Sequence, residues 1–484
     1  MAGLIAEGDA RLAVNVMGFL SDALGLSQAA RLYIAALRAA GVPVATTAIP
    51  PDAPSTSDAT VRRYGNRAHD ELQTPFESAF NLACMSGDHL VALARTSGGE
   101  VLAQRPTIGQ WAWETDVLPT SWLPAFSLVR EIWTFSTFVA ENVGRLSPVP
   151  VVMIPMAITV PDPAGVELPI ARDDRFTFLF TFDFFSTMRR KNAEGLIDAF
   201  ARAFAPSEGP RLLLKTINGR LRPGPADDLR SRIVQHPDIE LIDVYLEPKE
   251  NAALLARADC YVSLHRSEGF GLTLAESMAL GTPVIATSYS GNMDFMTPHN
   301  SYLVDWSPTQ IGPGCEIYPA HGSWAEPNLD HAAELMRRVW QRPEEALSKA
   351  ARGRTDIHRL YAPAVAGRLA RARLEHLADG NPSVSPVVSA GYAAGLSELR
   401  LAAVESELGL DLERGASPAP RGLRGLLRRL MLRLMLPFTT HERRFDRAVA
   451  HGLRGLKADL EREQAARAED RARIDRLEEQ LRGR

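Results

Sequence analysis

The stretch that decides the fold is Cys260-Tyr-Val-Ser-Leu-His-Arg-Ser-Glu268-Gly-Phe-Gly-Leu-Thr-Leu-Ala-Glu276-Ser-Met-Ala-Leu-Gly281-Thr-Pro-Val-Ile-Ala-Thr287. It predicts a buried strand, a glycine loop, a helix that ends at Gly281, and a second buried strand. Gly269 and Gly271 would let the backbone approach a ligand closely at the carboxyl end of a parallel strand. The N–H groups that open the following helix would face that ligand, which favours an anion.

Glu268 and Glu276 flank the glycine loop, and carboxylates at these places can accept hydrogen bonds from hydroxyl groups. A nucleoside diphosphate-sugar offers both an anion and hydroxyls. The structural alternative is that Glu276 caps a helix, because Thr273 and Glu276 have the spacing of a capping box, while Glu268 is a solvated loop residue. Two glycines that do not form GxGxxG leave both hypotheses open.

The remainder of the chain, from residue 12 to about residue 305, alternates short apolar runs with amphipathic segments. This alternation predicts two doubly wound α/β domains with parallel sheets. The expected strands are 12–17, 42–45, 107–113, 131–135 and 151–155, then 176–182, 211–215, 239–244, 260–264 and 284–286. The expected helices are 26–40, 193–204, 249–258, 329–341 and 343–377.

A Pro-rich, aperiodic segment at 156–172 separates the two series of strands. We therefore expect a Rossmann-like acceptor-side domain at 1–160 and a Rossmann-like nucleotide-sugar domain at 161–378, the latter with returning helices. Residues 379–420 are expected to form a linker, and 421–484 a helical tail. A length of 484 residues agrees with more than one domain.

Charge is distributed unevenly along the chain. Residues 421–484 carry a net charge of +7 and the other 420 residues carry −11. The acidic body argues against a nucleic-acid-binding enzyme. Residues 421–436 place five arginines opposite a leucine face and predict peripheral binding to an anionic membrane, although a helix docked on the catalytic body is the alternative. The apolar spacing at 453–481 predicts a weak coiled coil that allows self-association.

The cysteines and the N-terminus indicate the cellular compartment of the protein. Cys84, Cys260 and Cys315 have neither CxxC nor Cys/His spacing, which argues against disulfides and structural zinc. The N-terminus does not resemble a signal peptide, and no apolar run is long enough to span a bilayer. We expect a cytoplasmic protein, peripheral to the inner face of the cell membrane.

The E-x7-E pattern of Glu268 and Glu276, followed by SMALGTPVIAT and Ser290-Gly-Asn-Met-Asp294, resembles glycosyltransferase family 4. Members of that family retain the anomeric configuration and have the GT-B fold, in which two Rossmann-like domains face a cleft. The resemblance implies that Glu276 binds the ribose hydroxyls and that Glu268 contacts the transferred sugar. It also implies that the amides of Phe270, Gly271 and Leu272 face the sugar and the diphosphate. Gly269 is a further candidate for nucleotide-sugar binding.

Looser resemblance extends over residues 12–378. It implies that Gly18 and Gly25 belong to an N-terminal glycine loop at the donor, although such glycines are also common in turns. Glu114, in Trp111-Ala-Trp-Glu114, is a catalytic candidate because a carboxylate beside aromatic residues needs a partner or a role. Core packing is the alternative for the tryptophans.

Cations are expected at the diphosphate, whose negative charge grows as it leaves. The resemblance implies Lys191 as a catalytic residue together with Glu268. Lys215, at the carboxyl end of an apolar run, is a candidate binding residue, although an isolated lysine there is more often solvent-exposed. The family's usual Gly-Arg after the first strand of the second domain is replaced by Phe182-Asp183, so Arg190 is a further candidate for the cationic role. The family's N-domain histidine has no clear counterpart, which leaves the acid/base residue open.

Asp-x-Asp, the motif of metal-dependent GT-A enzymes, does not occur in the sequence. We therefore expect no metal and no cofactor, and transfer of a hexose to an acceptor hydroxyl with retention. The expected acceptor is a glycan or glycolipid in cell-surface polysaccharide synthesis; the donor base, uridine or guanosine, stays open. The alternatives are another GT-B sugar-nucleotide enzyme, such as an epimerase, and a membrane-associated scaffold that retains a degenerate GT-B fold.

Overall fold

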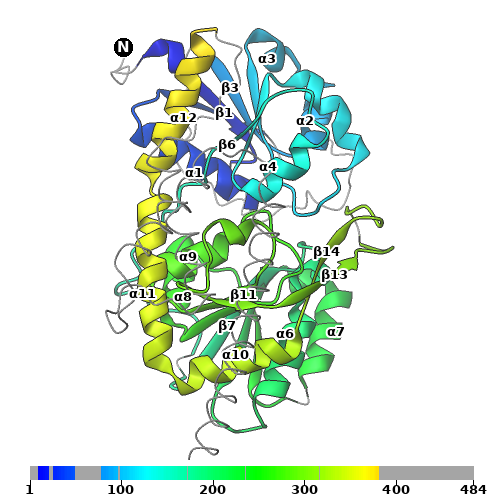
Figure 1. Cartoon of the computed structure of the whole chain (residues 1–484), viewed down its shortest axis with the longest axis vertical. Helices are drawn as coiled ribbons and strands as arrows, with labels where there is room; N and C mark the ends of the chain where they lie inside the picture. Colours follow the sequence, from blue (N-terminus) through cyan, green and yellow to red (C-terminus); the bar gives the residue numbers. More distant parts are fainter. Residues whose placement is uncertain are drawn as a thin grey trace, which may run out of the picture. The chain divides into compact units, whose positions relative to one another are not determined.

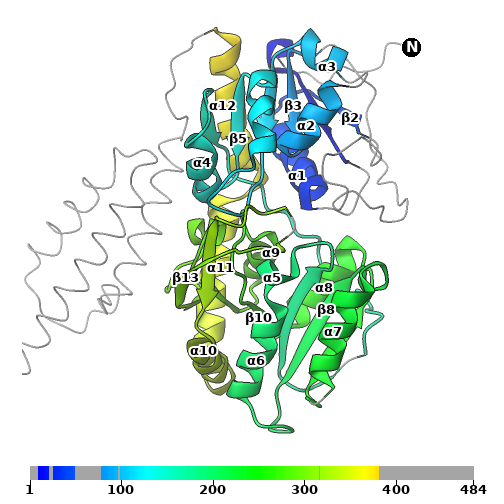
Figure 2. The same cartoon turned by 90° about the vertical axis from the view of Figure 1, so that its right-hand side faces the viewer.

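The computed structural model describes residues 9–20, 25–49, 78–95, 99–171, 173–234, 236–315 and 317–380. Within these ranges the chain forms two six-stranded parallel sheets, one in each half, with helices packed around them (Figures 1 and 2). The predicted fold class, two doubly wound α/β domains, is confirmed.

The first sheet has the strand order β2-β1-β3-β4-β5-β6. Four of its strands are buried at every position, as expected for strands covered on both faces. The strands are β1 (Val14–Gly18), β2 (Val44–Ala48), β3 (Phe80–Cys84), β4 (Thr107–Gln110), β5 (Glu131–Thr134) and β6 (Val151–Met153), and the helices are α1 (Gly25–Ala39), α2 (Gly87–Ala94), α3 (Gly99–Gln104) and α4 (Thr137–Gly144).

Strand β3 was not predicted, because Asn81 interrupts a run of only five residues. The structure satisfies this buried amide with partners on the neighbouring strands. Asn15 Nδ2 donates to Asn81 Oδ1 at 3.2 Å, and Asn81 Nδ2 donates to Thr107 Oγ1 at 3.2 Å. A polar residue inside a buried strand is thus stabilised by a cross-strand ladder that the local sequence does not reveal.

The second sheet has the order β12-β11-β10-β7-β8-β9, which is the Rossmann order. From β7 the chain continues through β8 to β9 at one edge of the sheet, and from β10 it continues through β11 to β12 at the other edge. The strands are β7 (Thr177–Asp183), β8 (Arg211–Ile217), β9 (Ile239–Asp243), β10 (Cys260–Ser263), β11 (Val284–Thr287) and β12 (Tyr302–Val304), and the helices are α5 (Met188–Lys191), α6 (Ala193–Ala203), α7 (Pro223–Ile233), α8 (Pro248–Arg257) and α9 (Leu272–Leu280). Short 3₁₀ segments lie at Ala10–Leu12, Thr120–Leu128, Gly219–Leu221 and Gly291–Asp294.

An antiparallel hairpin, β13 (Trp306–Gln310) with β14 (Ser323–Pro327), follows the second sheet and was not predicted. The first of these strands is largely exposed and contains Pro308, so its sequence lacks the apolar alternation that identifies a strand. The loop between the two strands reaches the site described below.

Three helices end the described part of the chain: α10 (Leu329–Gln341), α11 (Pro343–Leu360) and α12 (Pro363–Ala378). The prediction of helix at 329–341 is confirmed. The predicted helical stretch 343–377 is instead two helices, because Pro363 lacks the N–H that a continuing helix needs and begins a new helix.

Helix α12 packs beside α1 of the first half (Figure 1). An added Cβ on Gly367 would lie 2.0 Å from the Ala36 carbonyl oxygen, so the two helices meet through their backbones. Arg373 forms an ion pair with Glu131 of β5 at 2.5 Å, and both side chains are buried. Because loss of one partner would leave the other charge buried, this pair ties the last described helix firmly to the first sheet.

Among the described helices, none combines the length and the apolar character needed to cross a membrane. The predictions for the amphipathic segment 421–436, the coiled coil at 453–481 and nearly all of the 379–420 linker lie outside the described residues.

Candidate active site

The candidate site lies at the carboxyl edge of the second sheet, where β7 and β10 are neighbours and their connections diverge. Doubly wound sheets bind ligands in the crevice at this switch point. The connection after β10 carries Glu268, and the connection after β7 carries Lys191. The strand order therefore brings together two residues that are 77 positions apart in the sequence.

The glycine loop turns into helix α9 at Gly271, which is the N-cap residue with φ of +91°. This backbone conformation suits glycine and strains other residues. The first N–H groups of α9, starting at Leu272, have no acceptor within the helix and face the loop. The Phe270 side chain is buried against Phe295 and Tyr361, so this phenylalanine anchors the glycine loop in the core.

Glu276 lies in the second turn of α9 and is half-buried. Among the described residues, its carboxylate has neither a hydrogen-bond nor an ion-pair partner, and burial raises its pKa to about 7. The capping-box alternative is wrong: Gly271 is the N-cap, Thr273 is the second helical residue, and no side chain caps this helix. Glu276 is therefore a half-buried acceptor without a structural task in the described part of the chain.

Glu268 is held by two cations from the connection after β7. Lys191 Nζ lies 2.5 Å and Arg190 Nη1 3.0 Å from Glu268 Oε1. Burial by itself raises the pKa of Glu268, but Arg190 and Lys191 outweigh burial and lower it to about 2. Burial lowers the pKa of Lys191, and Glu268 opposes that change. Glu268 is therefore ionised at neutral pH.

Arg190 contacts more residues of the candidate site than the sequence indicated. Its side chain is only 6% exposed, and it links the two carboxylates, since Nη2 lies 4.0 Å from Glu114 Oε1. It also donates from Nη1 to the Ser267 carbonyl oxygen at 2.9 Å. In the sequence Arg190 was one of several cations, and only the turn of α5 reveals which one points inward.

Glu114 follows β4 of the first sheet and reaches this cluster from the opposite side. Tyr318, in the β13–β14 loop, donates its hydroxyl to Glu114 Oε2 at 2.9 Å, and Ser267 Oγ donates to the Glu114 carbonyl oxygen. The expected partner of Glu114 is thus present, although Tyr318 was not foreseen because the loop that carries it has no recognisable pattern. Trp111 and Trp113 are buried, in keeping with the core-packing alternative.

Lys215 lies on β8, one strand beyond β7, and is separate from the Glu268 cluster. Among the described residues no hydrogen bond or ion pair to its ammonium group is found, and its side chain is largely buried. Burial lowers its pKa to about 8, while Asp183 and Asp243 oppose the shift. Its register partner Thr181 lies 3.3 Å from Tyr261, so Lys215 projects on the sheet face that Tyr261 shares.

Gly18 and Gly25 were predicted on the opposite side of the cleft. Gly18 ends β1, and an added Cβ would lie 2.9 Å from the Cys84 carbonyl oxygen, so close strand packing already requires glycine there. Gly25 opens α1 with free space around it. Residues 21–24 between them lie outside the described ranges, and the donor contact of both glycines stays a prediction.

Direct contacts join the two halves at the glycine loop. Ser136, which caps α4, donates from Oγ to the Gly269 carbonyl oxygen at 2.5 Å. Thr137 donates its backbone N–H to Asp294 Oδ2 at 2.7 Å. The N-terminus of α4 thus packs against the loop that carries Glu268.

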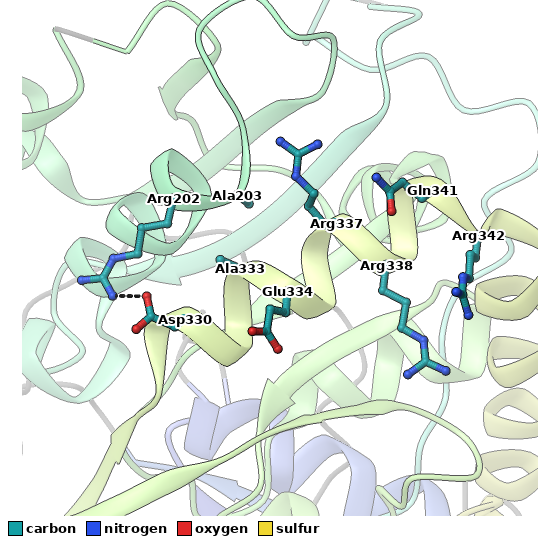
Figure 3. Close-up of a pocket in the computed structure, with 9 residues that line it drawn as sticks. All are labelled: Arg202, Ala203, Asp330, Ala333, Glu334, Arg337, Arg338, Gln341 and Arg342. Atoms are coloured by element: carbon teal, nitrogen blue, oxygen red, sulfur yellow. Dashed lines mark hydrogen bonds and ion pairs between the residues drawn. The ribbon is translucent and has the colours of Figure 1, made fainter.

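A surface groove lies elsewhere, between α6 and α10 (Figure 3). Its arginines are already engaged: Arg202 pairs with Asp330 at 2.7 Å and Arg337 with Glu208 at 2.6 Å. It contains no residue that the sequence analysis selected. The candidate site residues therefore lie at the sheet edge and not in this groove.

Comparisons with known proteins agree with the geometry. Residues 185–310 match the sequence model of the family described as Glycosyl transferases group 1. A search of curated protein sequences finds no match. The fold is similar to that of sucrose-phosphate synthase from Thermosynechococcus elongatus, with a TM-score of 0.53 and 16% identity over 76% of this chain and 99% of that one. It is also similar to Anabaena Alr3699/HepE solved with UDP-glucose, with a TM-score of 0.52 and 13% identity over 75% of this chain and 99% of that one.

The matched segment contains Glu268, Glu276, Lys191 and Lys215, and both similar structures extend over the two sheets. The predicted GT-B fold is confirmed, and the group 1 domain supplies the class of reaction. The chain is therefore a glycosyltransferase with the GT-B fold.

Proposed function

We propose that this enzyme transfers a hexose from a nucleoside diphosphate-sugar to an acceptor hydroxyl, with retention at the anomeric carbon, as a member of glycosyltransferase family 4. The observation that carries the proposal is the pair of glutamates on either side of the glycine loop. Glu268 is matched to two cations, whereas the half-buried Glu276 has no partner among the described residues. A donor hydroxyl would supply the partner that Glu276 lacks.

Glu276 is assigned to the ribose. A vicinal diol offers two hydroxyl hydrogens to one carboxylate, and such charge-assisted hydrogen bonds form best when the acceptor is ionised. The carboxylate has lost part of its hydration through burial, which makes a ligand hydroxyl a favourable replacement. Lys215, on β8 beside β7, would then attract the phosphates of the same nucleotide.

Lys191 and Arg190 are assigned to the diphosphate, together with the first N–H groups of α9. A diphosphate placed at this helix N-terminus would compete with Glu268 for both cations. Glu268 would then be free to accept a hydroxyl of the sugar. The cations stabilise the charge that develops on the diphosphate as it leaves, and they do so without a metal ion.

Glu114 is assigned to the acceptor side of the reacting centre. It comes from the first sheet and is joined to the donor-side residues through Arg190. Its carboxylate is 26% exposed, so an acceptor hydroxyl can reach it. The residue that removes the acceptor proton stays unassigned.

UDP-glucose is the first donor to test, because the similar Anabaena structure was solved with it. For the acceptor we propose a cell-surface polysaccharide or glycolipid. We further propose that residues 421–436 hold the enzyme at the cytoplasmic face of the membrane and that 453–481 support self-association, both on the sequence pattern alone.

The test is incubation of the full chain with a panel of uridine and guanosine diphosphate-sugars, without acceptor and with EDTA. We expect slow release of the nucleoside diphosphate from one donor, and proton NMR of the first-formed sugar should show the anomeric configuration of the donor. Binding without release would favour the scaffold hypothesis, and a donor epimer as product would favour an epimerase. Loss of turnover in EDTA that manganese restores would contradict the metal-free mechanism.

A further inference from the structure

His265 is a fully buried histidine three residues before Glu268, and the proposed function gives it no task. It follows β10 and lies beneath the glycine loop. Its ring is hydrogen-bonded to Asn292, and neighbouring residues of the same turn are hydrogen-bonded to the Glu268 backbone.

The partners of His265 determine which ring nitrogen carries the proton. Asn292 donates from Nδ2 to the Thr287 carbonyl oxygen at 3.0 Å, so its Oδ1 is the atom that faces His265 Nε2, at 3.2 Å. The Tyr289 carbonyl oxygen lies 3.4 Å from the same nitrogen. Both neighbours are acceptors, so Nε2 must carry hydrogen. Nδ1 then accepts from Ser263 Oγ at 3.1 Å.

Burial keeps this histidine neutral. Burial lowers the pKa of His265 to about 4; nearby Glu268 acts in the opposite direction, and Lys191 adds to the decrease. At neutral pH one nitrogen is therefore a donor and the other an acceptor, which is what the two partners require.

Asn292 belongs to the SGNMD turn, which we define as residues 290–294. This turn holds Glu268 by its backbone on both sides. The Glu268 N–H donates to Ser290 Oγ at 2.8 Å, and the Gly291 N–H donates to the Glu268 carbonyl oxygen at 2.9 Å. An added Cβ on Gly291 would lie 2.0 Å from the Gly269 carbonyl oxygen, so turn and loop are in direct backbone contact.

We propose that His265 is a positioning residue, which through its hydrogen bond to Asn292 holds the SGNMD turn against the glycine loop. It thereby fixes the place at which the Glu268 carboxylate contacts the sugar. This inference rests on the proposed function of Glu268. It assigns a role to the SGNMD turn that the donor-binding residues do not explain. A small displacement of a reacting group is enough to lower turnover strongly.

The experiment compares His265→Leu with His265→Gln in the full chain. Leucine removes the ring's hydrogen bonds to Asn292, Tyr289 and Ser263, whereas glutamine can donate to Asn292 and accept from Ser263. For His265→Leu we expect kcat on the best donor of the panel to fall at least about tenfold, with the Kd for UDP changed less than about twofold. For His265→Gln we expect most of kcat to return. His358→Leu is the matched control, since His358 bonds only the Ala279 carbonyl oxygen at the far end of α9 among the described residues.

Amide hydrogen exchange gives a readout that does not depend on activity. In His265→Leu the amides of Glu268 and Gly291 should exchange faster, while those of β10 keep their protection. Asn292→Ala should have the same effects and replaces His265→Leu if that variant does not fold. If the wild type releases no nucleotide from any donor, the proposed function fails, and the exchange pattern still decides whether His265 orders the loop.

Three outcomes would overturn the proposal. One is wild-type kcat and wild-type exchange in His265→Leu. Another is a parallel loss of kcat, UDP affinity and β10 protection, which would show general destabilisation. The third is a loss of kcat in His358→Leu as large as that in His265→Leu.

Discussion

Replacing Glu276 with glutamine should stabilise the free protein at pH 8 and, at the same pH, weaken nucleotide binding. Burial raises the pKa of Glu276 from 4.5 to about 7, and no described residue compensates its charge. At pH 8 the folded protein therefore carries an ionised carboxylate in a poorly solvated place. Glutamine keeps the shape of the side chain and removes that charge.

The magnitude follows from the difference between the folded and unfolded pKa values. Because the folded pKa is the higher one, the contribution of Glu276 to the free energy of unfolding is complete below about pH 4.5 and is lost as pH rises through about 7. At about 1.4 kcal/mol for each pH unit of difference, the loss is at most roughly 3 kcal/mol. Partial solvent access reduces this to on the order of 2 kcal/mol.

The binding effect has the opposite sign. Loss of a charge-assisted hydrogen bond to the ribose costs about 1.5–3 kcal/mol, which corresponds to a roughly ten- to hundredfold weaker Kd for UDP at pH 8. Wild-type affinity should itself decline as pH falls from 8 to 6, since the protonated carboxyl is the poorer acceptor. That decline should be smaller in Glu276→Gln.

Urea unfolding at pH 5 and pH 8 measures the first effect, and calorimetry with UDP and GDP measures the second. Glu344→Gln, at an exposed position in the first turn of α11, is the control and should change neither. The reasoning is refuted if Glu276→Gln binds both nucleotides as the wild type does, or if its gain in stability is the same at pH 5 as at pH 8.

Three further predictions address the cations, the second glutamate and the tail. Glu268→Gln should lower kcat while UDP affinity holds or increases, because Lys191 and Arg190 lose a competing carboxylate; calorimetry that shows weaker UDP binding would place Glu268 elsewhere. Lys215→Met should weaken UDP binding at pH 7 and remove a decline in affinity that the wild type shows above about pH 8, where Lys215 loses its proton; equal pH profiles would contradict this assignment. The full chain should float with anionic vesicles and a chain ending at Gly415 should not, because the sequence pattern of 421–436 predicts an amphipathic segment with five arginines; equal flotation would remove the proposed anchor.

Where candidate residues are close along the chain, the sequence predicted their placement in the fold. Gly271, Glu268 and Glu276 share one loop and one helix, so their spacing alone places them on the same edge of the sheet. It predicted less where distant segments meet. Tyr318 reaches Glu114 across 204 positions, through a hairpin that contains proline and little apolar pattern. The same limit explains β3, whose Asn81 is acceptable only because partners on neighbouring strands satisfy it.

The pairing of Glu268 with Lys191 and Arg190 has a consequence for how the enzyme binds its donor. The Glu268 carboxylate is paired with the two cations that we assign to the diphosphate, so under this proposal donor binding would exchange one anion for another. Such an exchange costs little charge desolvation, since the cations remain paired throughout. It would also release Glu268 only when a diphosphate is in place. The glutamate that contacts the sugar would thereby become available in the same step that delivers the sugar, and free nucleoside monophosphates, with one phosphate fewer, would release it less completely.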